Sequence, residues 1–320
     1  MRTEELPERI RTGRPLLLDG ALGTELERAH VPMALPLWTS RALLDAPGVV
    51  ERIHRRYTEA GAEILTAGTF RTQRRTLASA GLPDLAEELT RTAVALARRA
   101  AAGVNAAAHT GPPLVAGSAS PLEDCYRPDL APARAVLEQE HREHAQHLDA
   151  AGVDLILVET MNSAIEARAA AEAAAETGLP FLVSFACREG SGETGRRENG
   201  ALLSGEPLST GIEAVRDRGP LAVLVNCTPP SALDACLATL GESGLPFGCY
   251  PNLGAPRADG LPSEPQSPEA FATLATGWVA RGAALVGGCC GTGPEHVRAL
   301  AAALTPSTTS SSTISSTRPK

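Results

Sequence analysis

Short apolar runs alternate along the chain with longer segments that are rich in Ala, Arg and Glu. The short runs have the length and composition of buried strands, whereas the longer segments repeat apolar residues at helical spacing. We predict eight strands, at Pro15–Leu18, Glu63–Thr66, Leu114–Gly117, Leu155–Val158, Phe181–Phe185, Ala222–Val225, Phe247–Tyr250 and Ala284–Gly287.

Helices are predicted between and after these strands. They span Val49–Ala60, Leu85–Ala102, Pro132–Ala151, Ala164–Thr177, Ser209–Arg218, Ser231–Leu240, Pro268–Ala280 and Pro294–Ala303. Strands that alternate with helices form parallel sheets with crossover connections. Eight such units predict an α/β fold, a single-domain (β/α)8 TIM barrel. An open, doubly wound sheet is the structural alternative.

The barrel domain is expected to span residues 1–304. Residues 305–320 are nearly all Ser, Thr and Pro, and such a segment cannot bury enough apolar surface to fold, so we expect a disordered tail. Two segments, Cys187–Pro207 and Ala255–Pro268, are long enough to be binding loops over an active site.

Polar and metal-binding residue types follow the predicted strands. Active sites of (β/α)8 barrels lie at the C-terminal ends of the strands, so these side chains should share one rim. They are Asp19 and Gly20, Thr69, Ser118, Glu159, Asn226 and Cys227, Asn252, and Cys289 and Cys290.

Three cysteines carry the strongest chemical pattern. Cys289 and Cys290 are adjacent and flanked by glycines, and Cys227 follows another apolar run. Three thiolates from two strand ends suit a tetrahedral zinc ion with an open fourth position, which a substrate thiol can fill. A purely redox role for the trio is the alternative.

The other candidate ligands are expected to be structural. Four cysteines are interpreted as small buried apolar residues, and His296 as a first-turn helix residue. The histidines on one predicted helix are expected to face solvent. These residues are Cys125, Cys187, Cys236 and Cys249, and His141, His144 and His147.

Composition excludes several classes of partner. The chain of 320 residues is 43% hydrophobic, and none of its apolar runs approaches membrane-spanning length. Its net charge is −8 and its basic residues are scattered, which argues against nucleic acid. The first residues carry no secretory signal pattern, so we expect a cytoplasmic protein with reduced thiols. The expected partners are small-molecule substrates. Assembly into a homo-oligomer is compatible with the sequence.

Six ordered motifs resemble the zinc-dependent homocysteine S-methyltransferase family, from about Pro15 to about Leu304. They are Asp19–Glu25, Leu65–Phe70, Val158–Thr160, Val225–Cys227, Tyr250–Asn252 and Gly287–Thr292. The resemblance implies a (β/α)8 barrel in which Cys227, Cys289 and Cys290 ligate zinc. It also implies that Asp19, Gly20 and Glu159 contribute to the homocysteine site.

Asp19 and Glu159 could hold the α-ammonium group of an amino-acid substrate through charge-assisted hydrogen bonds. A helix cap for Asp19 and an internal salt bridge for Glu159 are the structural alternatives. Thr69 and Ser118 are candidates for the substrate carboxylate. Asn226 is expected at the substrate site, where it and Asn252 would orient the ligands.

The methyl donor is not specified by these motifs. A sulfonium or quaternary ammonium donor would be recognised by aromatic faces. The rings near predicted strand ends or loops are Trp38, Phe70, Tyr126, Phe185 and Tyr250. The segment Gly117–Tyr126 departs from the Gly-Pro-Tyr-Gly loop of the S-methylmethionine enzymes.

We therefore expect an enzyme that forms methionine from homocysteine and a small onium donor. One alternative acts on another thiol or selenol, or works with a separate corrinoid protein. The other is a zinc-binding or thiol-sensing protein without turnover.

Overall fold

Eight parallel strands form the centre of the molecule, as predicted. The computed structural model describes residues 1–103, 111–188, 200–253 and 266–305. Its strands are β1 (Leu16–Leu17), β2 (Ile64–Ala67), β3 (Leu114–Ala119), β4 (Leu155–Met161), β5 (Phe181–Phe185), β6 (Val223–Asn226), β7 (Phe247–Tyr250) and β8 (Leu285–Val286). Much of the two predicted binding loops, and the predicted tail beyond residue 305, lie outside the described residues.

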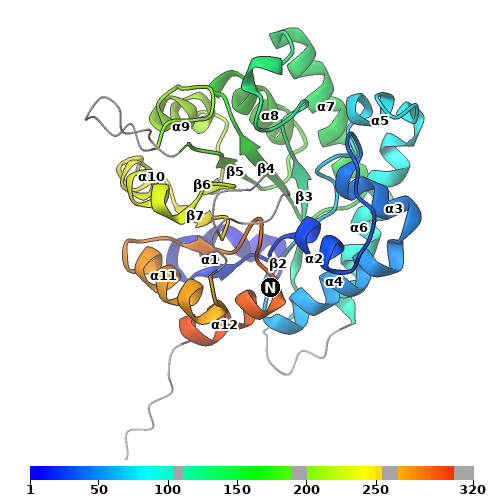
Figure 1. Cartoon of the computed structure of the whole chain (residues 1–320). Helices are drawn as coiled ribbons and strands as arrows, with labels where there is room; N and C mark the ends of the chain where they lie inside the picture. Colours follow the sequence, from blue (N-terminus) through cyan, green and yellow to red (C-terminus); the bar gives the residue numbers. More distant parts are fainter. Residues whose placement is uncertain (104–110, 189–199, 254–265, 306–320) are drawn as a thin grey trace, which may run out of the picture.

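The sheet closes into a barrel. The strand order β1-β8-β7-β6-β5-β4-β3-β2 leaves β1 and β2 at its two ends. Backbone hydrogen bonds join these ends, from Glu63 N to Leu17 O at 2.8 Å and from Asp19 N to Ile64 O at 3.1 Å. Figure 1 shows the strands ringed by helices, which confirms the (β/α)8 fold and excludes the open sheet.

All eight predicted helices are present, with bounds that differ by a few residues at most. They are α4 (Pro47–Ala60), α6 (Ala86–Ala102), α7 (Arg134–Ala150), α8 (Ala164–Glu176), α9 (Leu208–Arg216), α10 (Pro230–Glu242), α11 (Pro268–Ala280) and α12 (Pro294–Leu304).

The structure adds short helices that were not predicted. They are α1 (Leu6–Thr12), α2 (Leu22–Arg28), α3 (Arg41–Asp45) and α5 (Arg74–Ala78), with 3₁₀ turns η1 (Thr3–Glu5), η2 (Trp38–Ser40), η3 (Pro83–Leu85) and η4 (Pro128–Leu130). Segments of one or two turns are too short to display a helical repeat of apolar positions, so their sequence pattern is uninformative.

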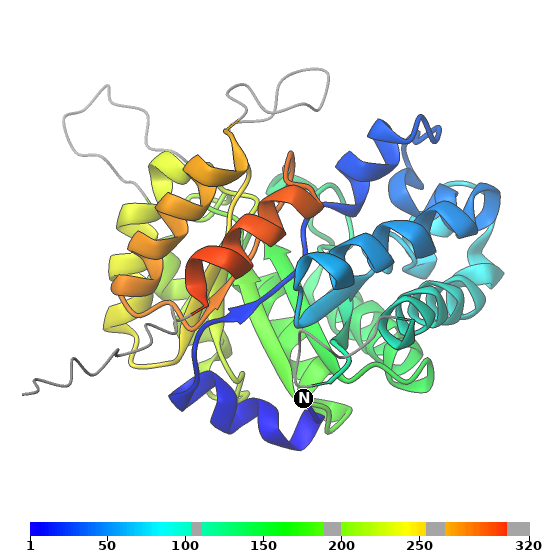
Figure 2. The same cartoon turned by 90° about the horizontal axis from the view of Figure 1, so that it is seen from below.

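Two apolar clusters lie on the two faces of the barrel wall. Residues alternate along each strand, so that Leu16 and Leu18 belong to the inner cluster and Leu17 to the outer one. Leu6 and Ile10 of α1 also join the inner cluster. Helix α1, the dark-blue helix at the bottom of Figure 2, therefore closes the N-terminal end of the barrel.

The expectation of solvent-facing histidines on α7 is wrong for His141 and His144, each of which is 2% exposed. Their spacing of three residues places both on the helix face that packs inward. The imidazole of His144 lies 3.1 Å from Ser118 O, and burial lowers its pKa to about 4. Nε2 of His141 lies 3.3 Å from a carboxylate oxygen of Glu166.

Within the ranges described, no helix is long and apolar enough to cross a membrane.

Candidate metal centre and active-site cavity

The three predicted metal ligands converge. Cys227 follows β6, while Cys289 and Cys290 follow β8, and their sulfur atoms all lie within 4.8 Å of one another. The sulfur atoms of Cys227 and Cys289 are 3.0 Å apart. In a tetrahedral site with zinc–sulfur bonds of about 2.3 Å, the sulfur atoms are roughly 3.8 Å apart, so small side-chain movements produce that geometry. Among the described residues, this is the one cluster of three His, Cys, Asp or Glu side chains at metal-ligand spacing.

Neighbouring strand ends hold the segment with the two adjacent cysteines. Cys289 N donates to Pro251 O at 2.8 Å, and Cys290 N donates to Oδ1 of Asn252 at 3.1 Å. Gly288 N donates to Asp19 O at 3.2 Å, and a Cβ on Gly288 would lie 2.4 Å from the Thr292 side chain. Asn252 therefore fixes the position of Cys290 through the Cys290 backbone.

Asn226 holds the other side of the cluster. Its Oδ1 accepts hydrogen bonds from Thr160 N at 3.0 Å and from the Ser184 hydroxyl at 2.7 Å. Its Nδ2 donates to the Thr160 hydroxyl at 2.8 Å. Thr160 and Cys227 both have positive φ, 61° and 49°, a conformation that residues with a Cβ seldom adopt. Asn226 thus fixes Thr160 in a strained backbone conformation next to Glu159.

The thiols face a cavity of about 660 Å³ at the C-terminal ends of the strands. Its lining includes most of the predicted site residues: Asp19, Gly20, Ser118, Glu159, Cys227, Cys289 and Cys290. Thr69 and Asn226 are not among the lining residues. The Thr69 hydroxyl accepts from Ser118 N at 2.8 Å and donates to Ser118 O at 2.9 Å. Direct substrate contact by Thr69 or Asn226 stays a prediction.

Asp19 and Glu159 are buried acids that lack a basic partner within the described residues. Asp19 is 5% exposed and accepts hydrogen bonds from Thr66 N and the Thr66 hydroxyl at 2.8 and 3.0 Å. Glu159 is 7% exposed and accepts from the Ser118 hydroxyl and from the Tyr250 hydroxyl, the latter at 3.1 Å. Asp19 is therefore not a helix cap, and Glu159 forms no salt bridge with any residue that the structure describes.

Burial dominates the electrostatics of both carboxyl groups. It raises the pKa of Asp19 to about 8 and that of Glu159 to about 7, against the lowering effect of their hydrogen bonds. Removal from water disfavours the charged form, and a nearby cation would reverse this effect. The part of the cavity that Asp19 and Glu159 line therefore favours a positively charged group.

Four of the five candidate aromatic residues line the cavity. They are Trp38, Phe70, Tyr126 and Tyr250, whereas Phe185 is fully buried in the outer core. The rings of Trp38 and Phe70 meet edge to face, with centroids 5.8 Å apart. Trp38, Phe70 and Tyr126 together form what we call the aromatic wall of the cavity.

Helix α2 belongs to the site, although its sequence did not predict it. Gly291 N donates to the Thr24 hydroxyl at 3.0 Å, and the guanidinium of Arg28 donates to Gly291 O at 3.0 Å. Arg28 and Arg56 both pair with the buried carboxylate of Glu25 at 2.7 Å. The motif Asp19–Glu25 therefore anchors the segment that follows the two cysteines.

The residues predicted to be structural lie apart from the three clustered thiols and their cavity, with one exception. Nδ1 of His296 accepts from Gly293 N at 3.1 Å in the first turn of α12, as predicted. Cys187, Cys236 and Cys249 are buried in the outer core. Cys125 is also buried, but it lines the cavity.

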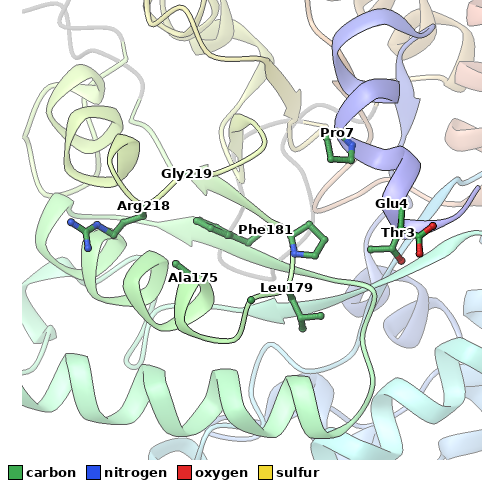
Figure 3. Close-up of a pocket in the computed structure, with 10 residues that line it drawn as sticks. Thr3, Glu4, Pro7, Ala175, Leu179, Phe181, Arg218 and Gly219 are labelled. Atoms are coloured by element: carbon green, nitrogen blue, oxygen red, sulfur yellow. The ribbon is translucent and has the colours of Figure 1, made fainter.

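A second cavity, of about 450 Å³, lies at the opposite end of the barrel (Figure 3). It is lined by residues such as Thr3, Pro7 and Phe181, and it contains no thiol. Arg218 also lines this cavity, and its guanidinium is paired with Asp217. The candidate active site is therefore the cavity that contains the cysteines.

Comparison with known proteins assigns the chain to a family. The family model described as homocysteine S-methyltransferase matches residues 16–304. The chain therefore belongs to the homocysteine S-methyltransferase family, as the sequence motifs indicated.

Individual relatives cover nearly the whole chain. Homocysteine S-methyltransferase 4 of Zea mays is 31% identical over 313 residues, which cover 90% of this chain and 89% of the maize protein. Selenocysteine methyltransferase of Astragalus bisulcatus is 28% identical, with 90% and 92% covered. The metallated form of the homocysteine methyltransferase MmuM from Escherichia coli has a TM-score of 0.79 at 30% identity, covering 92% of this chain and 99% of MmuM.

Replacing Asp19 by Asn should stabilise the metal-free protein, by an amount that increases with pH. The folded-state pKa near 8 exceeds the ordinary value of 3.8, so the folded chain retains a proton that the unfolded chain has lost. Wild-type stability therefore falls as pH rises from about 4 to about 8, with a slope approaching about 1.4 kcal/mol per pH unit. The variant lacks this loss.

Urea denaturation at about pH 5.5 and about pH 7.5 measures the difference between wild type and variant. Asp84→Asn is the control, because that side chain is 94% exposed. A stabilisation by Asp19→Asn that is the same at both pH values would contradict the assignment.

Proposed function

We propose that this protein transfers a methyl group from a small sulfonium or ammonium compound to homocysteine and forms methionine. One observation carries the proposal: three converging thiols and two buried, unpaired carboxyl groups line the same cavity. Homocysteine has the complementary groups, a thiol and an α-ammonium. Membership of the homocysteine S-methyltransferase family supports this assignment.

The metal is proposed to be zinc, held by Cys227, Cys289 and Cys290. Zinc favours thiolate ligands, and sites with three protein ligands leave one position for substrate. Bound there, zinc would lower the pKa of the homocysteine thiol and make its thiolate available near neutral pH.

Asp19 and Glu159 are proposed to orient homocysteine through its ammonium group. The positive charge would favour their ionised forms and offset the burial that raises their pKa values. Glu159 is itself positioned by the Ser118 hydroxyl, and Ser118 is held by Thr69. In this arrangement Thr69 and Ser118 align the carboxylate of Glu159. Ser118 also lines the cavity.

The methyl donor is proposed to bind against the aromatic wall of Trp38, Phe70 and Tyr126, because ring faces attract onium groups. The homocysteine sulfur forms a bond to the methyl carbon while the bond from that carbon to the onium atom breaks. The electron pair of the broken bond remains on the departing sulfide or amine. The residues contribute by alignment, which can supply a large part of the rate enhancement.

A donor screen tests the proposal directly. Zinc-loaded protein is incubated with homocysteine and, in separate reactions, with S-methylmethionine, S-adenosylmethionine or betaine, and methionine is measured. We expect product with at least one donor. Selenocysteine is the second acceptor, because the Astragalus relative is a selenocysteine methyltransferase. Zinc binding without product from any donor or acceptor would instead indicate a sensor.

Replacing Cys289 by Ala should remove zinc while leaving the barrel folded. A metal at the rim does not hold together the two apolar clusters of the wall, whereas two remaining thiols bind zinc poorly. After dialysis, elemental analysis should give about one zinc per wild-type chain and almost none for the variant. Cys236→Ala is the matched control, since Cys236 is buried in α10, and it should retain zinc. Loss of helical circular dichroism in Cys289→Ala would contradict a purely catalytic role for the metal.

Replacing Glu159 by Gln should raise the KM for homocysteine by roughly 10- to 100-fold, because the amide has nearly the same shape but lacks the charge that pairs with ammonium. The amide oxygen can accept from one of the Ser118 and Tyr250 hydroxyl groups, while its NH2 group donates to the other. The KM for the donor should change much less. Glu27→Gln is the control, because Glu27 lines the same cavity but is exposed. Equal effects of the two variants would show a general charge effect and not recognition by Glu159.

A further inference from the structure

One side of the cavity is built from a short irregular stretch, residues 122–126, which we call the wall segment. Cys125 and Tyr126 at its end line the cavity, and Tyr126 belongs to the aromatic wall. Leu122 at its start is 1% exposed and packs with Leu137 of α7 and Ala169 of α8. Because Leu122 is buried, its backbone N–H requires an acceptor from within the protein.

Glu166 of α8 is this acceptor. Its carboxylate accepts from Leu122 N at 2.8 Å and lies 3.3 Å from Nε2 of His141 on α7. Glu166 is 1% exposed and lies in the first turn of α8, where the positive end of the helix dipole favours an anion. Glu166 thus joins the wall segment to two helices of the barrel.

Asn162, which follows β4, binds the other end of the wall segment. Its Nδ2 donates to Cys125 O at 3.0 Å, and the residue is 1% exposed. Two buried polar side chains therefore hold the backbone of the wall segment, one near each end.

The local sequence predicts a different use of Glu166. Ser163 and Glu166 have the spacing of a capping box, in which the two side chains bond the free N–H groups of the helix start. Ser163 is the N-cap residue of α8, but it makes no side-chain cap hydrogen bond, and its buried hydroxyl has no partner among the described residues. The helix start thus lacks a stabilising motif while the Glu166 carboxylate bonds the wall segment. Departures from a local rule of this kind are typical of functional sites.

We propose that Glu166 and Asn162 are positioning residues that hold the wall segment, and with it the Tyr126 ring, in place beside the thiols. Neither is among the residues that line the cavity, so both act through the backbone of Leu122 and Cys125. This inference rests on the proposed function, because it concerns how the donor side of the same cavity keeps its shape.

Glu166→Met tests the proposal, because methionine occupies a similar volume but cannot accept from Leu122 N. The zinc-loaded variant should show a KM for the methyl donor that is raised about 10-fold or more, the effect of losing a hydrogen bond to a charged group. Its kcat and its KM for homocysteine should change little. Glu166→Gln keeps an acceptor oxygen and should restore most of the donor affinity. Glu172→Met is the control, because Glu172 lies on the same helix but pairs with Arg168.

Cys125 reports the position of the wall segment without any turnover. It is 7% exposed, so iodoacetamide should alkylate it slowly in the wild type, and peptide mapping reads this thiol alone. Glu166→Met and Asn162→Ala should each accelerate alkylation of Cys125 by about 10-fold, because each releases one end of the segment. Ser163→Ala should leave the rate unchanged, because the Ser163 hydroxyl has no partner to lose. Circular dichroism establishes that each variant is folded.

The outcomes separate a positioning role from a structural one. A Glu166→Met protein that is less stable in urea but keeps the wild-type donor KM and the wild-type alkylation rate overturns the proposal and assigns Glu166 to folding alone. If Glu166→Met does not fold, Asn162→Ala decides, and an unchanged rate of Cys125 alkylation overturns the proposal.

Failure of the proposed function is recognised separately. If the wild-type protein forms no methionine with any donor, the proposed transfer fails, while alkylation of Cys125 still measures whether the wall segment is held. Equal alkylation rates in the wild type, Glu166→Met and Asn162→Ala overturn the positioning role in that case.

Discussion

The site depends on hydrogen bonds that fix the end of β8 against its neighbours. Gly288 N bonds to Asp19 O beyond β1, and Cys289 N bonds to Pro251 O beyond β7. Through these contacts the adjacent thiols of Cys289 and Cys290 face Cys227 at the end of β6. Two neighbouring residues on a regular strand point to opposite faces, so presentation of both thiols to one point requires this non-strand geometry.

The same rim carries an energetic cost that function explains. Two carboxyl groups are buried without basic partners in the described part of the chain, and Thr160 and Cys227 adopt strained backbone angles. Such features reduce stability and persist where the surrounding structure determines them. Here the fully bonded carboxamide of Asn226 restrains Thr160, while the closed barrel wall supplies the apolar burial that compensates for the cost.

The sequence predicted the barrel and the cysteine cluster well, because both follow from regular patterns. Buried strands are continuous apolar runs, and strand ends in a barrel share one rim, so the convergence of Cys227 with Cys289 followed from their positions. The prediction for His141 and His144 was wrong because helical spacing alone does not say which face is buried. The pairing of Arg75 with Glu140 in the cavity wall was also out of reach, because it joins residues 65 positions apart.

Helix α2 shows how a short element can couple the two halves of the proposed reaction. Its Gly23 packs so closely on Trp38 that a Cβ would lie 2.6 Å from the indole ring. One residue later, the Thr24 hydroxyl accepts from Gly291, directly after the two cysteines. A displacement of α2 would therefore move the aromatic wall and the thiols together. The separation between the aromatic wall and the thiols is thus set by one short helix that contacts both. The proposed methyl transfer between two bound molecules requires alignment of this kind.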